Sequence, residues 1–159
     1  MMTFEPERVK STNGQAKSRE AVRLTFRSSS DYWGESLSFA INGKLHPQVQ
    51  SSHAANFRSL AVLPEGKSLL WIGKIIRRAQ GEDEVMFRVY DEDENFDVTE
   101  PATWHIGSRG LSLDASLDLV LLSSAGSAPR IVDELRIGST WRSVVPSFDG
   151  KLSKQQESQ

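Results

Sequence analysis

Oxygen-bearing residues at every second position are the first feature of this sequence that could bind a ligand. They lie in the stretch DEDENFD and are Asp91, Asp93, Asn95 and Asp97. Oxygen ligands at this spacing are typical of the first half of a calcium-binding loop. An EF-hand would also need glycine at the sixth position and glutamate at the twelfth, where this chain has Phe96 and Ala102. We therefore reject an EF-hand and keep two interpretations, a calcium site at these four residues and a solvated acidic turn.

Paired carboxylates could also serve a glycan hydrolase, because such enzymes hold two acidic side chains about 5 Å or about 6.5 to 9.5 Å apart. Glu82 and Glu84 are two residues apart, so they would share one face of a strand. Met86 stands where a third acidic residue would continue the row. The histidines match no metal-binding spacing, and no Gly-x-Ser-x-Gly motif accompanies them; they are His46, His53 and His105. The sequence therefore favours a protein that is not an enzyme.

Aromatic side chains are the third candidate, because an exposed aromatic face offers a large apolar contact area to a sugar ring. Tyr32 and Trp33 stand in SSSDYWGES, a polar stretch typical of a turn, and Trp104 lies near the start of a predicted strand. We predict ligand contacts for these three residues, with packing over the end of a sheet as the alternative for Tyr32 and Trp33. Trp71 and Trp141 lie in apolar surroundings and are predicted to be core or anchoring residues.

The elements that must position these side chains are strands, because apolar and polar residues alternate along much of the chain. The run SLLWIGKII is nearly all apolar, and its β-branched isoleucines and Gly73 favour a strand over a short helix. Asn42-Gly43 predicts a two-residue hairpin turn. The stretch AANFRSLAVL stays ambiguous. The predicted strands cover residues 20–27, 35–41, 68–78, 83–91, 117–124 and 130–138.

Length and composition predict one all-β domain. A chain of 159 residues can bury roughly 70% of its unfolded surface, so its core needs no disulfide or metal. The absence of cysteine excludes disulfides and thiolate metal sites. We predict a β-sandwich over residues 20–146, between a flexible arm at 1–19 and a flexible tail at 147–159, because both ends are polar.

The charge pattern limits the partners. The net charge is −2 and the basic residues are scattered, which argues against a nucleic-acid partner. No run of 18 apolar residues is present, so we predict no membrane-spanning helix. The first twenty residues lack the apolar core of a signal peptide.

The segment VDELRIGSTWRSVVP, residues 132–146, resembles the closing segment of concanavalin A-like lectin/glucanase domains of the laminin-G-like type. Such domains end in a strand of the form Asp-Glu-aliphatic-Arg-Ile-Gly, which here is Asp133 to Gly138. A Thr/Ser-Trp turn and a final Val-Pro follow, here Thr140-Trp141 and Val145-Pro146. LLWIGKI, GEDEVMFRVYD and EPATW are similar to the middle strands and to a Glu-Pro-Ala stretch of the same family. The resemblance covers residues 69–146, about half of the chain.

The resemblance implies an antiparallel β-sandwich of jelly-roll type, truncated on its N-terminal side because relatives have a longer first half. A truncated sheet would leave an exposed edge, for which we expect dimerisation or aggregation. The family implies a non-catalytic, lectin-like module that recognises a glycan or a cell-surface protein outside the cytoplasm. Its enzymes use a Glu-x-Asp-x-Glu strand that this chain does not supply. A small glycan hydrolase and a purely structural scaffold are the alternatives.

The closing motif itself is interpreted as structural. Adjacent residues of a strand point to opposite faces of the sheet. Asp133 and Glu134 would therefore not face one substrate together.

Overall fold

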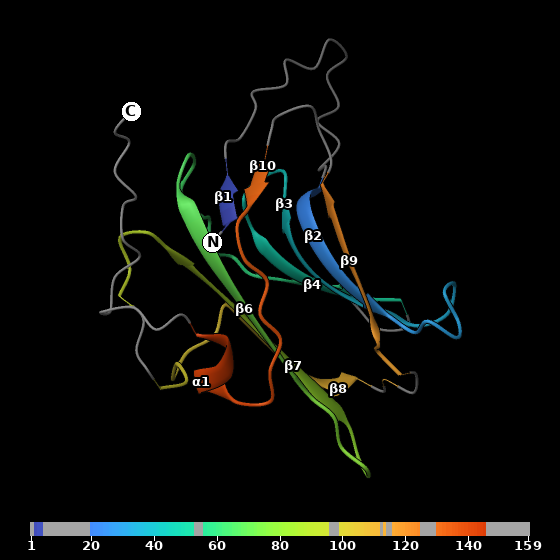
Figure 1. Ribbon diagram of the computed structural model, residues 1–159. Helices are drawn as coiled ribbons and strands as arrows, with labels where there is room; N and C mark the ends of the chain where they lie inside the picture. The colour runs from blue at the N-terminus through green and yellow to red at the C-terminus, as the bar shows by residue number, and fades with distance from the viewer. Residues whose placement is uncertain are drawn as a thin grey trace.

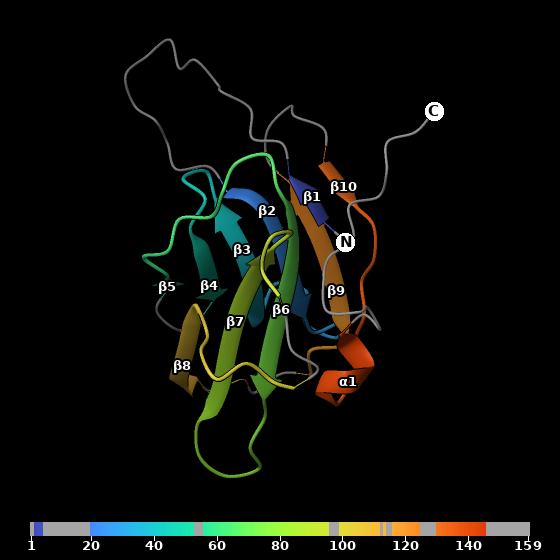
Figure 2. The same ribbon diagram turned by 90° about the vertical axis from the view of Figure 1, so that its left-hand side faces the viewer.

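The chain forms an antiparallel β-sandwich, which confirms the predicted fold class. The computed structural model describes residues 2–4, 20–52, 56–95, 99–111, 113, 116–124 and 130–145. The elements are β1 (Met2–Phe4), β2 (Glu20–Arg27), β3 (Ser36–Asn42), β4 (Pro47–Ser51), β5 (Phe57–Arg58), β6 (Ser68–Ile76), β7 (Asp83–Asp91), β8 (Ile106–Leu111), β9 (Leu119–Ser124), β10 (Arg130–Val132) and α1 (Trp141–Val144). Sheet A has the order β10-β1-β6-β7-β8 and sheet B the order β5-β4-β3-β2-β9 (Figures 1 and 2).

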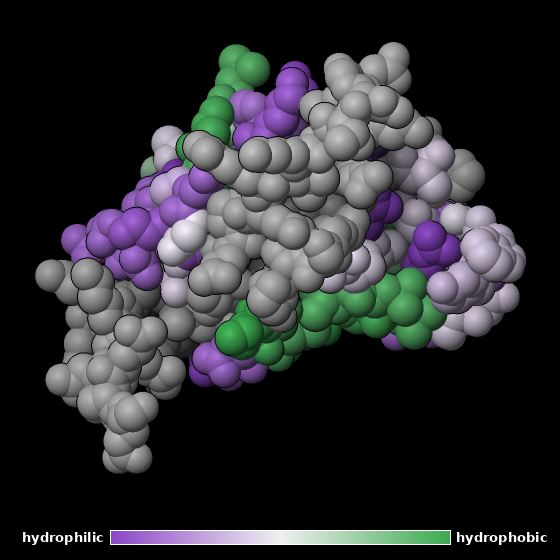
Figure 3. Space-filling model, turned by 90° about the horizontal axis from the view of Figure 1, so that it is seen from above, coloured by the Kyte–Doolittle hydropathy of each residue, from purple (hydrophilic) through white to green (hydrophobic). Residues whose placement is uncertain are grey.

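Strand β10 is shorter than the sequence predicts, so the predicted strand over residues 133–138 is wrong. The described ladder of β1 with β10 ends at the pair Met2 and Val132, and residues 133–138 have no strand structure. The chain continues to α1 without regular structure and exposes Leu135 and Ile137. Figure 3 shows a hydrophobic band on the side of the molecule that faces the viewer in Figure 1, where β9 and β10 lie.

Two further details differ from the expectations. The sequence predicts that residues 2–4 belong to a flexible polar arm. They instead form β1, between β10 and β6. The hairpin after β3 is longer than two residues, because the carbonyl oxygen of Asn42 accepts the N–H of Leu45, which has φ of 62°. The Asn42 side chain closes this turn by accepting the N–H groups of Lys44 and His46 at 2.9 and 3.1 Å.

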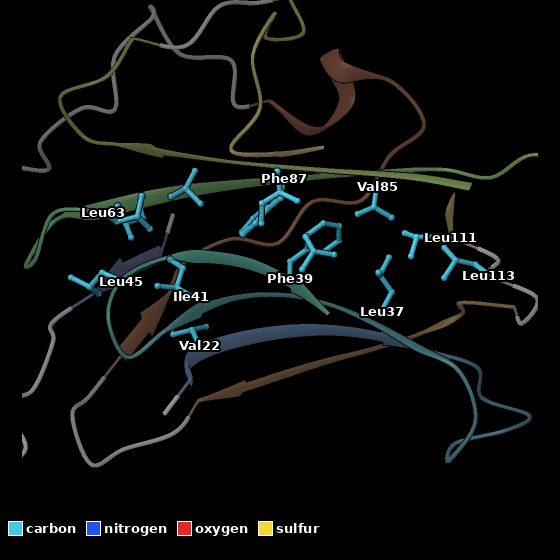
Figure 4. Close-up of a cluster of buried hydrophobic side chains, with 14 residues drawn as sticks. Val22, Leu37, Phe39, Ile41, Leu45, Leu63, Val85, Phe87, Leu111 and Leu113 are labelled. Carbon is cyan, nitrogen blue, oxygen red and sulfur yellow. The ribbon is translucent and has the colours of Figure 1, made fainter. Parts of the chain in front are cut away.

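The core lies between the two sheets, because alternation places one apolar face of each sheet inward. Its labelled side chains point into the space between the layers in Figure 4. Rings from both sheets meet there: the ring centroids of Phe39 on β3 and Phe87 on β7 are 5.2 Å apart. Phe26 on β2 packs edge-on against Phe39 at 6.0 Å. Trp71 packs against this core, as the sequence predicts.

Gly73 on β6 leaves the space that the Phe39 ring fills. A Cβ atom at Gly73 would lie 2.8 Å from Cζ of Phe39 and 3.0 Å or less from two more ring atoms. The close approach of the two sheets at this point therefore depends on the missing side chain.

The outer face of sheet A has a second apolar cluster, which the C-terminal segment covers. Ile72 and Tyr90 project from that face and pack with Val145, and all three are buried. Trp141 of α1 packs against this cluster, which confirms its predicted anchoring role. Arg136 ties the segment to the end of the helix, because its Nη1 donates to the carbonyl oxygen of Val145 at 3.2 Å. Figure 4 shows α1 above sheet A, on the side away from sheet B.

No helix in the described part of the chain is long and apolar enough to cross a membrane.

Replacing Gly73 with alanine will destabilise the fold, because the new methyl group overlaps the Phe39 ring. Overpacking of this kind costs about 1 to 3 kcal/mol, which urea denaturation of the purified variant would measure. Gly107 on β8 is the matched control, since a Cβ there meets no atom within 4 Å. Gly107→Ala should raise the stability by roughly 0.5 to 1 kcal/mol, because alanine loses less conformational freedom on folding. Equal effects of the two substitutions would contradict the interlocking of the sheets.

Candidate functional site

The acidic residues after Tyr90 form a turn that is closed by its own backbone. The Asp91 carboxylate accepts the N–H groups of Asp93 and Glu94 at 2.8 and 3.1 Å. Lys67 lies beside the turn and forms ion pairs with Glu92 at 2.8 Å and with Asp93 at 2.9 Å. The hydrogen bond to Glu92, followed by that to Asp93, raises the pKa of Lys67, and its partner Glu92 has a lowered pKa for the same reason.

This arrangement uses the oxygens that a calcium ion would need. Asn95 is exposed in the same turn, and Asp97 lies outside the described residues. The described residues contain no group of three or more histidine, aspartate or glutamate side chains placed to hold a metal ion. A calcium ion at Asp91 and Asp93 would have to compete with the Lys67 ammonium and with the backbone donors. The calcium site therefore stays a prediction.

The carboxylates considered for glycan hydrolysis lie at the opposite end of β7. Glu84 is buried and pairs with Arg78 and, at 3.4 Å, with Arg109. Glu82 is exposed and precedes the strand. Glu82 and Glu84 are therefore in different environments. Among the described residues, neither of them shares a cleft with the aromatic candidates.

Asp83, between them, holds the end of the β6–β7 hairpin to the chain after β8. Its carboxylate accepts the N–H of Arg78 at 2.8 Å and the N–H of Leu113 at 2.9 Å. Burial raises the pKa of Asp83, but these two donors and the Arg77 guanidinium lower it further, so the pKa lies below its usual value. A general acid needs a raised pKa, so this carboxyl is suited to a structural role.

Trp104 belongs to the covered face of sheet A. Its ring packs edge-on against Trp141, with centroids 6.4 Å apart, and contacts the apolar cluster under α1. Its half-buried side chain therefore lies over the outer face of sheet A, whereas Tyr32 and Trp33 lie in the loop between β2 and β3 of sheet B. The three aromatic residues that were predicted to contact a ligand do not form one site.

Tyr32 and Trp33 form an exposed aromatic pair in the β2–β3 loop, which projects beyond the end of sheet B in Figure 1. Trp33 is 87% exposed and meets Tyr32 edge-on, with ring centroids 5.0 Å apart. Arg27, at the end of β2, lies over the Tyr32 ring at 5.0 Å and donates to the Tyr32 carbonyl oxygen at 2.6 Å. The pair is thus held in place by the sheet while the Trp33 ring stays in solvent.

A second anchor fixes the start of this loop. Asp118, just before β9, accepts the backbone N–H of Ser29 at 2.7 Å and its hydroxyl at 2.5 Å. The hydroxyl and the N–H of Ser29 lower the pKa of Asp118. Gly34 closes the loop under the Asp31 side chain, because a Cβ there would lie 2.1 Å from Asp31 Oδ2. An exposed aromatic ring on a restrained loop loses little conformational entropy when it binds.

The outer face of sheet B is a polar surface beside this loop, and the sequence reasoning did not single it out. The strands β2 and β3 bow toward the core in Figure 4, so the opposite face is concave. Small residues of the central strand β3 lie low on this face: Ser38 is buried and shares a hydrogen bond of 3.0 Å with Thr25. Above β3, Arg23 Nη2 donates to Gln50 Oε1 at 2.8 Å, which joins β2 to β4.

The face is also basic. By strand register, Arg23, Arg27 and Arg58 point to this side. The signal was present in the sequence, because Arg23, Thr25 and Arg27 alternate with the core residues of β2. Alternation alone could not tell that α1, the helix in the described part of the chain, covers the outer face of sheet A and not this one.

These features define an antiparallel β-sandwich with one outer face covered by its C-terminal segment and a polar, concave outer face beside an exposed aromatic pair. Comparisons with protein-family models, with curated proteins and with solved structures found no match to this chain.

His105, just before β8, is hydrogen-bonded to the neighbouring strand β7 and is expected to make the fold sensitive to pH. Its Nδ1 accepts the N–H of Val89 at 3.1 Å, so the ring is neutral with its proton on Nε2. Burial first, and then the Arg88 guanidinium, lower the pKa of His105 below its ordinary 6.5, whereas Glu94 opposes the shift. The stabilisation is complete above the pKa of the unfolded chain and is lost as the pH falls through the folded pKa.

Lowering the pH from about 8 to about 5 will therefore reduce the free energy of unfolding, in part because the unfolded chain protonates His105 first. His105→Asn keeps an oxygen acceptor for the Val89 N–H but does not titrate. Urea midpoints at several pH values would separate the two proteins, and the midpoint of the native chain should fall more steeply. Identical pH profiles would mean that His105 is not coupled to folding.

Proposed function

We propose that this chain is a non-catalytic, lectin-like binding module, and that its ligand is a glycan bound at the outer face of sheet B beside Tyr32 and Trp33. The observation that carries this proposal is the 87% exposure of Trp33 on a loop restrained by Arg27 and Asp118. An exposed tryptophan ring offers a large apolar surface to a ligand, and tryptophan is enriched at the centres of binding sites.

The polar face next to the loop complements the aromatic pair. Sugars present hydroxyl groups around an apolar ring face, so they need both hydrogen-bonding side chains and an aromatic surface. Gln50 of β4 and Arg23 of β2 project from the concave face, whereas Gln48, on the same side of β4, is buried. A ligand that stacked on Trp33 could extend along this face and meet these donors and acceptors.

The state of the carboxylates supports a protein that binds rather than cleaves its ligand. Among the described residues, the carboxyl groups with displaced pKa values are all displaced downward; they are Asp83, Glu92, Asp118 and Glu134. A glycosidase requires one carboxylic acid whose pKa is raised so that it can donate a proton. Glu134, of the closing motif, is instead paired with Arg136 at 2.7 Å.

Screening the purified chain against a glycan array will identify the sugar class that it binds. We expect Trp33→Ala to weaken that binding at least about tenfold, because it removes the stacking surface. Leu60→Ala is the matched control, since Leu60 is 88% exposed but lies in the β5–β6 connection. The control should bind as the unaltered chain does.

The same screen distinguishes the alternatives. Binding that disappears with a chelator would assign calcium a role and direct attention to the turn at Asp91. Cleavage of a bound oligosaccharide would show an enzyme. A blank array from a folded sample, or equal loss in Trp33→Ala and Leu60→Ala, would contradict the proposal and favour a scaffold.

A further inference from the structure

Sheet edges expose unpaired backbone N–H and C=O groups, and proteins usually protect them from pairing with another chain. Three of the four edges of this sandwich are protected. Strands β5 and β10 are only two and three residues long. Strand β8 carries Arg109 and Gly110, which has φ of 86°, and its register with β7 shifts at this point. Short strands, a charged side chain and a bulge are the ordinary means of protection.

Strand β9 has none of these protections. It contains six residues, LVLLSS, with no charge, glycine or proline. It pairs with β2 in unbroken register from Leu119 opposite Arg27 to Ser124 opposite Val22. Within the part of the chain that the structure describes, no strand pairs with its other side. The occupant of this edge must be an extended strand, because only a strand satisfies a row of backbone donors and acceptors.

The side of the molecule that contains β9 is also unusually apolar. Of the eight exposed large hydrophobic residues in the described chain, four lie on β9, on β10 or just after it; they are Leu122, Ile131, Leu135 and Ile137. Figure 3 shows a hydrophobic band on this side of the molecule. Leu122 faces inward in register with Leu24, yet 48% of it is exposed, so the core is open at this edge.

We propose that β9 pairs antiparallel with β9 of a second copy of this chain, about a two-fold axis at Leu121. In this register Leu121 lies opposite its own copy, and Val120 lies opposite Leu122 of the partner. The apolar row that runs from Phe39 through Leu24 to Leu122 then continues into Val120 and Phe26 of the second copy, because Phe26 lies opposite Val120 in each sheet.

Charge and polarity explain why the partner is a second copy. Two β9 strands bring no like charges together. Leu119 of one copy lies opposite Ser123 of the other, which is small and uncharged. The arginines of β2 point to the outer face one strand away from the axis. The pairing would join the two copies of sheet B into one continuous sheet. It does not depend on whether the concave face binds a glycan.

Light scattering on the eluting protein will measure the mass, and we expect twice the mass of one chain. Leu122→Lys places a charge at the edge and should give single chains, whereas Leu60→Lys, the same change at a more exposed leucine of the β5–β6 connection, should stay dimeric. A single-chain mass for the unaltered protein at high concentration would overturn the proposal. Far-ultraviolet circular dichroism checks that Leu122→Lys is folded.

A second experiment does not depend on that variant. The chain has no cysteine, so one introduced cysteine is the only thiol. Leu121→Cys should give covalent dimers with mild oxidation or a short thiol cross-linker, because the two side chains face each other across the axis. Ser123→Cys should not, since its copy lies about 13 Å away along the strand, and Gly107→Cys on β8 reports random collisions. Equal cross-linking at 121 and 123, or at 121 and 107, would overturn the pairing.

Discussion

The contact of Phe39 with Gly73 and Phe87 is the constraint on which the rest of the structure depends. It joins the centre of one sheet to the centre of the other, and it requires that the strands on both sides present their apolar residues inward. Once the inward residues are set, strict alternation sets the outward ones. The polar outer face of sheet B and the apolar outer face of sheet A are therefore consequences of the same central packing.

The two outer faces differ in what covers them. On sheet A the residues that alternate with the core include Ile72 and Tyr90, which require a cover, and the segment around Trp141 supplies it. On sheet B the corresponding residues include Arg23, Thr25 and Ser38, which form hydrogen bonds among themselves or with Gln50. A surface that satisfies its own polar groups can remain open to water and can exchange that water for a ligand.

Much of the fold could be predicted from the sequence, because strands β2, β6 and β7 have long runs of alternating or apolar residues. The ends of elements could not. Residues 133–138 do not continue β10, and the partner of β10 is β1, which consists of residues near the other end of the chain. Of the candidate site, the exposed loop with Trp33 could be found from residue type and a polar setting. The position of Trp104 could not be predicted, because it depends on a contact with Trp141 in a distant segment. Alternation within one segment does not reveal contacts between segments.

Both sheets pair strands from the beginning of the chain with strands from near its end, and this order affects how the chain folds during synthesis. The β6–β7 hairpin joins segments that are close in sequence, but Leu24 pairs with Leu122, and Thr3 pairs with Ile131. Each sheet therefore contains a strand from the beginning of the chain whose neighbour is made near the end. Contacts between distant segments form slowly, because a long loop must close first. A ribosome-bound chain would hold β1 and β2 without these neighbours until β9 and β10 have emerged.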